Sequence, residues 1–368
     1  MRGELPKNTR TELSEPHSPQ RILLINPGST STKLAVFEEG REIRNETVRH
    51  SSAELAGYST IWEQFPFRLQ TCRRWIGGQA DRFSAVVANG GLLRPVEGGV
   101  YAINERMLRD ARSNLQGEHA SNLSSELVFE LARERKCCAF IVDPVSVDEF
   151  EPLARYSGHP SIQRKSLSHA LNIHAAAGWA AGEVHKPLGE SSFVIGHLGG
   201  GISIAAVRAG RIVDVNDAAS DGPFSPERTG GLPLQQFISL CFSGSHSERE
   251  IRSLVMGKGG LVSYLVTNST EEVEQRIHSG DMKAKEIYEA MAYQIAKEIG
   301  AMAAVLKGDV DAVVLSGGMS RSAMLTGWIE GRVKHISSVM VHPGDDEMKT
   351  LACRVMNVLR GQEQAKEY

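Results

Sequence analysis

The segment Asn26–Lys33 joins a sharp turn to a dense set of hydrogen-bond donors. It reads Asn-Pro-Gly-Ser-Thr-Ser-Thr-Lys and follows an apolar run directly. Glycine lets the backbone turn so that peptide N–H groups converge on an anion, and the hydroxyl groups of Ser29, Thr30 and Ser31 add donors. Lys33 supplies a point charge of the kind that binds phosphate. The pattern favours a phosphate-binding loop; the alternative is a hairpin turn whose Ser and Thr side chains cap local N–H groups.

Two further glycine-rich loops also follow apolar runs. Their glycines are Gly199, Gly200, Gly201, Gly317 and Gly318. Adjacent glycines lose much backbone entropy on folding and suit a plain turn poorly, but they let a bulky ligand touch the main chain. Glycine loops at three strand ends therefore indicate a bound nucleotide.

Other phosphate-binding and hydrolytic designs are absent from the sequence. Neither the Walker A pattern nor G-x-G-x-x-G occurs, which excludes a P-loop and a dinucleotide fold. H-E-x-x-H and G-x-S-x-G are also missing, which removes the commonest zinc-protease and hydrolase-elbow interpretations. What remains is a duplicated, actin-like ATPase architecture.

The elements that must position these loops follow from apolar periodicity and from Gly and Asn punctuation. Strands are predicted over residues 21–26, 33–38, 42–48, 84–88, 139–143, 192–198, 202–208, 211–215, 311–315 and 337–342. Helices are predicted over 60–75, 104–115, 122–135, 162–181, 234–241, 281–306 and 346–360, with one more between the last two strands. Hairpins followed by alternating strands and helices indicate α/β domains with mixed sheets.

The opening pattern returns 170 residues later, which suggests an internal duplication. This shift lays Ile25 on Ile195, Ala35 on Ala205, Gly40 on Gly210 and Arg41 on Arg211. The duplicated domains are predicted to face each other across a cleft lined by the glycine loops, because ligands usually bind between domains. The predicted division is a flexible tail over 1–20, a first domain over 21–182 and a second over 183–368, with the last helix either in the second domain or returning to the first.

Composition narrows the partners. The chain has 368 residues, a net charge of −3 and 41% apolar residues, so it has no basic field for nucleic acid or anionic lipid. No apolar run approaches the roughly 20 residues of a membrane-spanning helix. The five cysteines form no C-x-x-C pair, which favours a reducing compartment. Because the first twenty residues lack an apolar segment, we expect a cytoplasmic protein. The net charge and the short apolar runs lead us to expect no binding to nucleic acid or membrane.

From Arg21 onward the chain resembles the butyrate kinases, a branch of the acetate kinase family. The stretches that carry the resemblance are RILLINPGSTSTKLAVF (21–37), GGLLRPVEGGVY (90–101), GEHASNL (117–123), SGHPSIQRKSLSHALN (157–172), HLGGGISIAAVRAGRIVDVND (197–217), GPFSPERTGGLPL (222–234) and AMAYQIAKEIGAMAAVLKG (290–308).

The resemblance implies reversible transfer of a phosphoryl group from ATP to a short aliphatic carboxylate, giving ADP and an acyl phosphate. The acceptor would be butyrate or a branched acid of four to five carbons. The implied fold consists of duplicated ribonuclease H-like domains of the acetate and sugar kinase, heat-shock 70 and actin superfamily. Mg²⁺ dependence and a homodimer or larger homo-oligomer are implied as well.

The resemblance also assigns roles to single residues. For the nucleotide these are Ser29, Thr30, Ser31, Lys33, His197, Gly199, Gly200, Gly201, Gly317 and Gly318. Magnesium is assigned to Asn26 and Glu347, with Asp345 and Asp346 as neighbouring alternatives to the glutamate. The substrate is assigned to Asn89, Gly90, Gly91 and Arg228, and catalysis to Arg228, Asp143, Lys165 and His169.

These residue types suit the reaction. A carboxylate is already a nucleophile, so the enzyme's task is to bring two anions together and to neutralise charge on the transferring phosphoryl group. Structural alternatives stay open for three of the residues. Arg228 could anchor a loop, Asp143 could cap a helix before Pro144, and His197 could be a core histidine. For His169, packing near the cleft is the alternative to an active-site role.

Two departures from the family pattern bear on activity. Butyrate kinases usually carry arginine where this chain has Asn89, and losing that charge-assisted contact would cost roughly 2–5 kcal/mol. An Asp-x-Arg pair that contacts the nucleoside is replaced by Ser269 and Glu271. Lys165 stands where acetate kinases have histidine and marks only the butyrate branch. Two hypotheses follow: an active carboxylate kinase, or an impaired paralogue that binds a nucleotide or acyl ligand as a regulatory protein.

Overall fold

The computed structural model describes residues 19–77, 82–344 and 347–368, and its contacts form two compact units. The first unit holds the described residues up to Val147 together with the segment from Glu347 to Tyr368, and the second holds Asp148–Gly344. The boundary expected at 182 differs from this division, because the helix Ala170–Glu183 packs on the sheet of the second unit. Of the tail expected over 1–20, the first 18 residues lie outside the described part of the chain.

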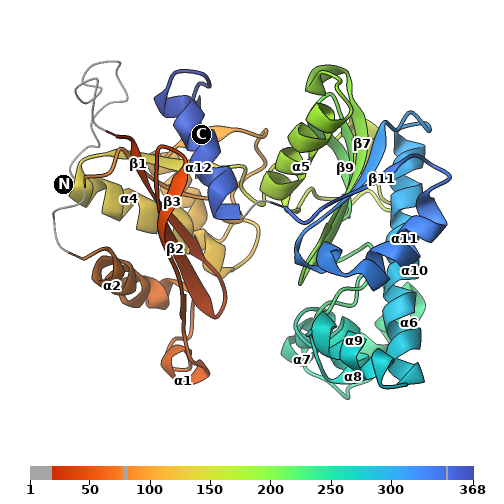
Figure 1. The fold of residues 1–368 in the computed structure, drawn as a ribbon. Helices are drawn as coiled ribbons and strands as arrows, with labels where there is room; N and C mark the ends of the chain where they lie inside the picture. The colour runs from red at the N-terminus through yellow and green to blue at the C-terminus, as the bar shows by residue number, and fades with distance from the viewer. Residues whose placement is uncertain (1–18, 78–81, 345–346) are drawn as a thin grey trace. The chain divides into compact units, whose positions relative to one another are not determined.

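The first unit is built on a seven-stranded mixed sheet with the order β12-β5-β6-β4-β1-β2-β3. Figure 1 labels three of its strands, β1, β2 and β3. Its strands are β1 (Arg21–Pro27), β2 (Ser31–Glu38), β3 (Arg41–Arg49), β4 (Ala85–Ala88), β5 (Val100–Ala102), β6 (Cys138–Val142) and β12 (Lys366–Glu367). Its helices are α1 (Ser52–Leu55), α2 (Phe65–Ile76), α3 (Glu105–Arg112), α4 (Leu123–Arg135) and α12 (Glu347–Leu359), with 3₁₀ turns η1 (Trp62–Gln64) and η2 (Ala120–Asn122).

The second unit is built on a five-stranded sheet with the order β11-β10-β7-β8-β9. Its strands are β7 (Ser192–Leu198), β8 (Ile202–Arg208), β9 (Arg211–Val215), β10 (Ala312–Ser316) and β11 (Val339–His342). Its helices are α5 (Ala170–Glu183), α6 (Leu234–Cys241), α7 (Glu248–Val255), α8 (Gly260–Leu265), α9 (Thr270–His278), α10 (Met282–Val305) and α11 (Ala323–Val333), with 3₁₀ turns η3 (Pro152–Arg155), η4 (Leu188–Glu190) and η5 (Gly318–Arg321).

The two sheets repeat one topology, as the duplication predicted. The order β6-β4-β1-β2-β3 in the first unit matches β11-β10-β7-β8-β9 in the second. The hairpin turns agree in backbone conformation, because Glu39 and Gly40 have φ of 48° and 80° and the residues 170 positions later, Ala209 and Gly210, have 53° and 78°. Positive φ at both central residues matches the type I′ turn that suits a twisted hairpin. The register shift between Val36 and Phe37 also recurs 170 residues later.

Helices cover both faces of each sheet. In the first unit α4 packs on the face formed by alternate residues such as Leu23, Ile25 and Val86. The buried side chains of α12 lie outside that cluster and contact β1, β4 and β6, so α12 covers the opposite face. In the second unit α10 packs on the face that includes Val194 and Val313, and α5 covers the other. The central strands of each sheet are thus buried on both faces, which is the arrangement expected of α/β domains, whereas the edge strand β3 is largely exposed.

Most predicted strands are confirmed, and one predicted helix is wrong over its first half. The helix expected over 162–181 begins only at Ala170. Arg164 in the preceding segment donates to the carbonyl oxygens of Ala154 at 2.8 Å and Val215 at 3.2 Å, and these tertiary bonds replace a helical turn. The helix expected over 60–75 starts as the 3₁₀ turn η1, and α2 itself begins beside Pro66. Within the described residues, no helix has the length and apolarity needed to cross a bilayer.

Candidate active site

The first predicted phosphate loop connects β1 to β2. Gly28 N donates to Ser31 O at 2.8 Å, which closes the turn, and Ser29 and Thr30 are exposed. Among the described residues, the peptide N–H groups and hydroxyls of Ser29 and Thr30 have no acceptor. Lys33 lies opposite Asn26 in the β1–β2 pairing, is exposed, and has no ion-pair partner in the described part of the chain. The loop therefore presents donors and one positive charge to solvent, as an anion site requires.

The two residues assigned to magnesium lie together. Asn26 Nδ2, at the end of β1, donates to Glu347 Oε2 at 2.8 Å, at the start of α12. This leaves the amide oxygen of Asn26 without a donor among the described residues. The alternatives Asp345 and Asp346 lie outside the described residues. A carbonyl oxygen beside a carboxylate is the donor chemistry that Mg²⁺ prefers.

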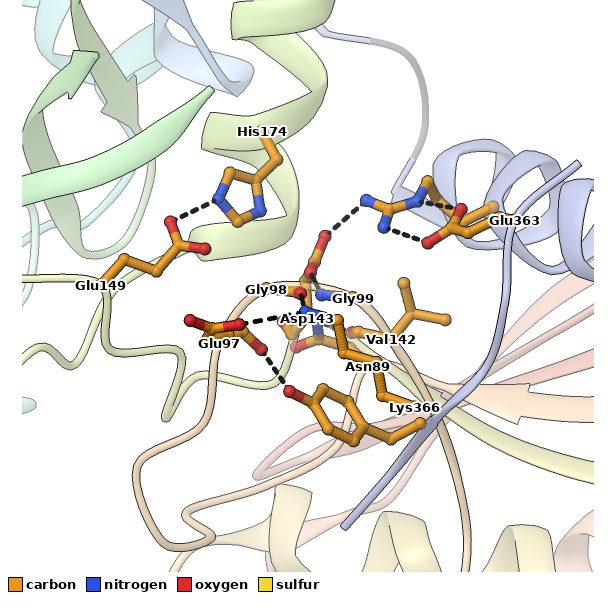
Figure 2. A network of polar contacts seen from close by, with 12 residues as sticks. Asn89, Glu97, Gly98, Gly99, Val142, Asp143, Glu149, His174, Glu363 and Lys366 are labelled. Carbon is orange, nitrogen blue, oxygen red and sulfur yellow. Dashed lines mark hydrogen bonds and ion pairs between the residues drawn. The ribbon is translucent and has the colours of Figure 1, made fainter. Parts of the chain in front are cut away.

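Asn89 ties two strand ends together rather than pointing its amide outward. Its Nδ2 donates to the carbonyl oxygens of Val142 at 3.0 Å and Asp143 at 2.7 Å, which joins the end of β4 to the end of β6 (Figure 2). The glycines that follow are held tightly. Gly90 has φ +93° and a Cβ there would clash with Ile141, while a Cβ on Gly91 would lie 2.6 Å from Asn122. The loop is thus held by close backbone contacts, and Asn89 brings no charge to it.

Asn122 is a positioning residue that the sequence did not single out, although it lies in the quoted stretch GEHASNL. It is fully buried, its Oδ1 accepts from Leu92 N at 2.9 Å, and its Nδ2 donates to Gly117 O at 2.9 Å.

Arg94, which lies close to Asn89 in sequence, does not supply a free positive charge to this loop. Its Nε contacts Asp110 at 2.5 Å, and Asp110 also accepts from the hydroxyl of Tyr368 at 2.9 Å. Arg94 is therefore committed to a structural ion pair.

Asp143 is fully buried at the end of β6 and has the left-handed φ of +40°. Its Oδ1 accepts from Gly99 N at 2.6 Å, and its Oδ2 contacts Nη1 of Arg354 on α12 at 2.9 Å. Arg354 Nη2 also forms an ion pair with Glu363 at 2.7 Å, so the Asp143 carboxylate is part of a larger polar network (Figure 2). The predicted cap before Pro144 is absent from these contacts. The geometry shows a residue that fixes the loop and α12 from within the protein.

In the second unit, Arg228 lies flat against the glycine loop. A Cβ on Gly201 would lie 2.5 Å from Nη1 and 2.8 Å from Cζ of Arg228, so only glycine allows this approach. Arg228 Nη1 donates to Ala218 O at 2.9 Å. Burial lowers the pKa of Arg228, while Glu227 and Asp217 act to raise it. Because arginine stays charged in proteins, the glycine loop has a fixed cation beside it.

Two histidines next to Arg228 are held neutral. The rings of His169 and His197 lie 4.5 Å apart, and His169 Nδ1 is 2.9 Å from the hydroxyl of the buried Ser203. Burial lowers the pKa of His197 to about 4. Burial, followed by the nearby His197 and Arg228, holds the pKa of His169 well below its usual value. At neutral pH the positive charge of this cluster is therefore that of Arg228.

The loop that carries Arg228 is locked by close backbone contacts. Ser225 Oγ donates to the carbonyl oxygen of Gly200 at 2.6 Å, which joins the SPER segment to the glycine loop. Gly260 has φ +59°, and a Cβ there would collide with the carbonyl oxygen of Ser225. Gly230 has φ +60°, and a Cβ there would lie 2.5 Å from Gly222 O. These contacts hold Arg228 at one place on the loop.

The remaining residues named from the sequence lie in different surroundings. Gly317, at φ +86°, packs on the end of β7, where a Cβ would lie 2.5 Å from Leu198 O, and Gly318 begins η5. Lys165 is exposed and contacts none of the other candidates among the described residues. The segment with Ser269 and Glu271 caps α9, since Ser269 Oγ accepts from Glu272 N at 3.1 Å and donates to Glu271 at 3.0 Å. Its side chains are engaged locally.

Asp221, close to the Arg228 loop in sequence, gives a pH-dependent prediction. Burial raises its pKa to about 6, with Asp217 and Glu298 adding to the effect, and its Oδ1 is buried without a hydrogen-bond partner among the described residues. Because the folded protein holds this proton more tightly than the unfolded chain, the stabilisation present below the unfolded pKa is lost as pH rises through about 6.

We therefore expect Asp221→Asn to be more stable than the unmodified protein at pH 7.5 by about 1–2 kcal/mol, after allowing for solvent screening. The difference should shrink toward zero as pH falls to about 4, near the ordinary aspartate pKa. Urea unfolding of both proteins at pH 4, 5, 6 and 7.5 measures it. A difference that is independent of pH, or a less stable variant at pH 7.5, contradicts this account.

Proteins named butyrate kinase resemble this chain over nearly its whole length. The model of the Acetokinase family matches residues 168–349. The protein named probable butyrate kinase from Listeria monocytogenes serotype 4a (strain HCC23) is 50% identical over 351 residues, which cover 94% of this chain and 99% of that protein. Butyrate kinase 2 of Clostridium acetobutylicum is 46% identical over 352 residues, covering 95% and 99%.

Two solved structures share the fold. A Porphyromonas gingivalis acetate kinase gives a TM-score of 0.74 at 16% identity, covering 92% of this chain and 100% of that one. A propionate kinase from Francisella tularensis gives a TM-score of 0.69 at 17% identity, covering 90% and 98%. This likeness confirms the predicted mixed α/β fold.

Proposed function

This chain belongs to the acetokinase family and is a phosphotransferase with a carboxylate as acceptor, and we propose that the acceptor is butyrate or a branched acid of four to five carbons. Use of ATP and ADP follows from the family. The resemblance in sequence predicted this membership, which the relatives named butyrate kinase confirm. The residue roles below are part of the proposal.

One observation carries the proposed chemistry: the guanidinium of Arg228 packs against Gly201, beside the neutral His169 and His197. Transfer of a phosphoryl group spreads negative charge over its equatorial oxygens, and a fixed cation that needs no rearrangement stabilises that charge. Arg228 meets this requirement because backbone contacts hold its loop. In the proposal, Arg228 stabilises the transferring group, and the glycine loop allows the phosphates to approach the main chain.

The first loop is proposed to hold the nucleotide's phosphates. Ser29, Thr30 and Ser31 offer hydroxyl groups, and Lys33 offers an exposed ammonium group. His197, Gly199 and Gly200 are proposed to hold phosphate in the second unit, and Gly317 and Gly318 to lie beside the base. The orphaned Nδ1 of His197, which is buried without a partner among the described residues, fits a ligand contact at this cluster.

Asn26 and Glu347 fit a magnesium ion that keeps most of its water. Both offer oxygen atoms and they lie side by side. Two protein oxygen ligands suffice for such an ion, because Mg²⁺ is usually bound by one or two carboxylates and keeps several waters. When bound, Mg²⁺ would neutralise charge on the phosphates. Asn26 would offer its amide oxygen while its Nδ2 orients the Glu347 carboxylate.

A carboxylate panel tests the acceptor, and Asn89 gives the sharpest variant. Hydroxamate trapping of acyl phosphate with ATP, Mg²⁺ and acetate, propionate, butyrate, isobutyrate or isovalerate should show turnover that favours the four- and five-carbon acids. Because the Asn89 amide is uncharged and its Nδ2 donates to Val142 and Asp143, position 89 offers the substrate no charged contact. We expect Asn89→Arg to raise kcat/KM for the carboxylate about 10- to 100-fold through a charge-assisted hydrogen bond.

Asn89→Ala is the matched control, because it breaks the same strand-end bonds without adding a charge. If Asn89→Arg performs no better than Asn89→Ala, the arginine position does not limit this chain. If folded protein shows no turnover with any acid, before or after Asn89→Arg, the acceptor proposal fails and the alternative of a ligand-binding paralogue takes its place.

We further propose a homo-oligomer in the cytoplasm. The helix α6 supports self-association because none of its residues is buried and its apolar side chains Leu234 and Ile238, with Phe242 just beyond it, are exposed. The segment from Thr229 to Ser247 carries no acidic or basic side chain apart from His246, so two copies can meet there without like-charge repulsion. Light scattering against the 40.1 kDa of one chain tests the assembly. The five free cysteines fit a reducing compartment.

A further inference from the structure

Arg68 lies beneath the first phosphate loop and is fully buried. It belongs to α2, and its guanidinium grips the loop from the protein side. Nη2 donates to Ser29 O at 3.1 Å and Nη1 donates to Ser31 O at 3.0 Å. Gln64 Oε1 accepts from Nε at 3.1 Å and from Nη2 at 3.0 Å, and Thr32 Oγ1 accepts from Nη1 at 3.3 Å. Every donor direction of the guanidinium plane is therefore used on this loop or its support.

Among the described residues, no carboxylate contacts the guanidinium of Arg68. Its acceptors are two peptide carbonyls, an amide oxygen and a hydroxyl, all of them neutral. A charge buried without a counter-ion is costly, because desolvation is not repaid by an opposite charge. Desolvation accordingly lowers the pKa of Arg68, yet arginine remains protonated in proteins. The buried cation would be better stabilised by an anion placed on the far side of the loop.

The contacts of Arg68 also decide which way the loop's peptide groups point. In a planar trans peptide the C=O and the following N–H point in opposite directions. Because Ser29 O is directed at Arg68, the N–H of Thr30 points away from it. This is the N–H that lacks an acceptor among the described residues. The arginine thus turns donors outward at the place where phosphate is proposed to bind.

His50 completes the support of the loop. Its Nε2 lies 2.8 Å from Thr32 Oγ1, the same hydroxyl that accepts from Arg68. Since Arg68 can only donate, the hydroxyl hydrogen of Thr32 is available to Nε2 of a neutral imidazole. Burial, followed by the charge of Arg68, lowers the pKa of His50. His50 is therefore kept neutral, and the only positive charge among these supporting side chains is that of the Arg68 guanidinium.

We propose that Arg68 is a positioning residue that holds the Ser29–Ser31 loop in its anion-binding form and sets an uncompensated positive charge behind it for the phosphates of the nucleotide. The inference rests on the proposed function in that it takes this loop as the phosphate site. It adds a residue that touches neither substrate nor the reacting atoms and that acts through the direction of backbone groups. It also predicts which part of the nucleotide will respond when Arg68 is changed.

Calorimetric titration with ATP, ADP and adenosine separates this role from a merely structural one. Arg68→Met keeps an unbranched apolar stem but removes the charge and all the guanidinium bonds. We expect its affinity for ATP to fall about 10- to 100-fold, its affinity for ADP to fall less, and its affinity for adenosine to stay within twofold. Arg68→Lys keeps the charge but loses the planar five-donor group that reaches the Ser29 and Ser31 carbonyls together, and we expect an intermediate loss of ATP affinity.

Arg73→Met is the matched control, because Arg73 lies on the same helix but is exposed and paired with Glu134. It should leave all three affinities unchanged. Equal losses for ATP and adenosine in Arg68→Met would show a collapsed unit and overturn the proposal, as would unchanged ATP affinity.

If Arg68→Met does not fold, Gln64→Met removes only the neutral acceptor of the guanidinium. It should lower the affinity for ATP by a smaller factor than Arg68→Met and leave the affinity for adenosine unchanged. The absence of that selectivity overturns the proposal. The proposed function fails separately: an unmodified protein that binds ATP with this selectivity but yields no acyl hydroxamate refutes the acceptor and leaves the role of Arg68 intact.

Discussion

Arg228→Met should lower kcat for acyl phosphate formation by about 10³-fold or more while the protein keeps its fold. A fixed arginine on a transferring phosphoryl group is worth about 10³–10⁵ in rate, because it meets charge that appears only in the transition state. In this chain the neighbouring histidines are neutral at physiological pH, so within this cluster no second cation takes over. The loss should appear in kcat more than in the KM for ATP, because ground-state phosphate contacts are assigned to other groups.

Two further variants sharpen that result. Arg228→Lys keeps a charge but loses the planar group that lies on Gly201, so it should recover only a small part of the rate. Arg249→Met removes an exposed arginine from α7 of the same unit and should leave kcat unchanged. Steady-state kinetics with thermal unfolding of each variant is the measurement. A kcat for Arg228→Met within tenfold of the unmodified enzyme would falsify the role assigned to it.

Asp143→Ala should destabilise the first unit by about 3–5 kcal/mol, because it leaves part of a buried charge pair without its partner. The carboxylate is fully buried and holds both Gly99 N and the guanidinium of Arg354. Arg354 keeps Glu363, which lies at the edge of the network, but this second acid does not replace the bond into the core. Urea unfolding followed by a probe in the first unit measures the loss.

A double-mutant cycle separates the structural role of Asp143 from the proton or substrate role that the family resemblance assigned. Asp143→Asn keeps an acceptor for Gly99 N, and Arg354→Met removes the cation that would otherwise be unpaired. The combined variant should regain part of the stability lost by Asp143→Ala, with a positive coupling between the two sites. If Asp143 acts only by positioning, kcat recovers with stability. If the double variant is stable but inactive, Asp143 takes part in the chemistry.

The repeated hairpins could be predicted because local rules determine them. A turn with positive φ at two successive residues favours glycine, and alternating apolar residues fix the faces of the strands, so Gly40 and Gly210 indicated both hairpins. The start of α5 could not be predicted this way. Its preceding segment is held by bonds from Arg164 to Ala154 and Val215, and partners far along the chain leave no local pattern.

The site residues show the same division. The loops with Lys33 and Gly199 were found because their residue types are unusual for plain turns. The inward orientation of Asn89 and the pairing of Asp143 with Arg354 required the tertiary structure, because the paired residues lie 54 and 211 positions apart. Arg68 left a weak signal, since it shares the buried face of α2 with Leu69 and Cys72. An arginine on an apolar stripe marks a buried cation, but the sequence does not show what it grips.

Two helices, α5 and α12, each pack on a sheet other than the one they follow in the chain, and this makes the order of synthesis important. The helix α5 follows the last central strand of the first sheet but packs on the second, whereas α12 follows the last strand of the second sheet but packs on the first. The second unit is one continuous segment, Asp148–Gly344, and it can be completed as soon as that segment leaves the ribosome. The first unit must wait with one sheet face uncovered until the end of the chain arrives. Although domains usually fold from the N-terminus as they are made, this chain finishes its N-terminal half last.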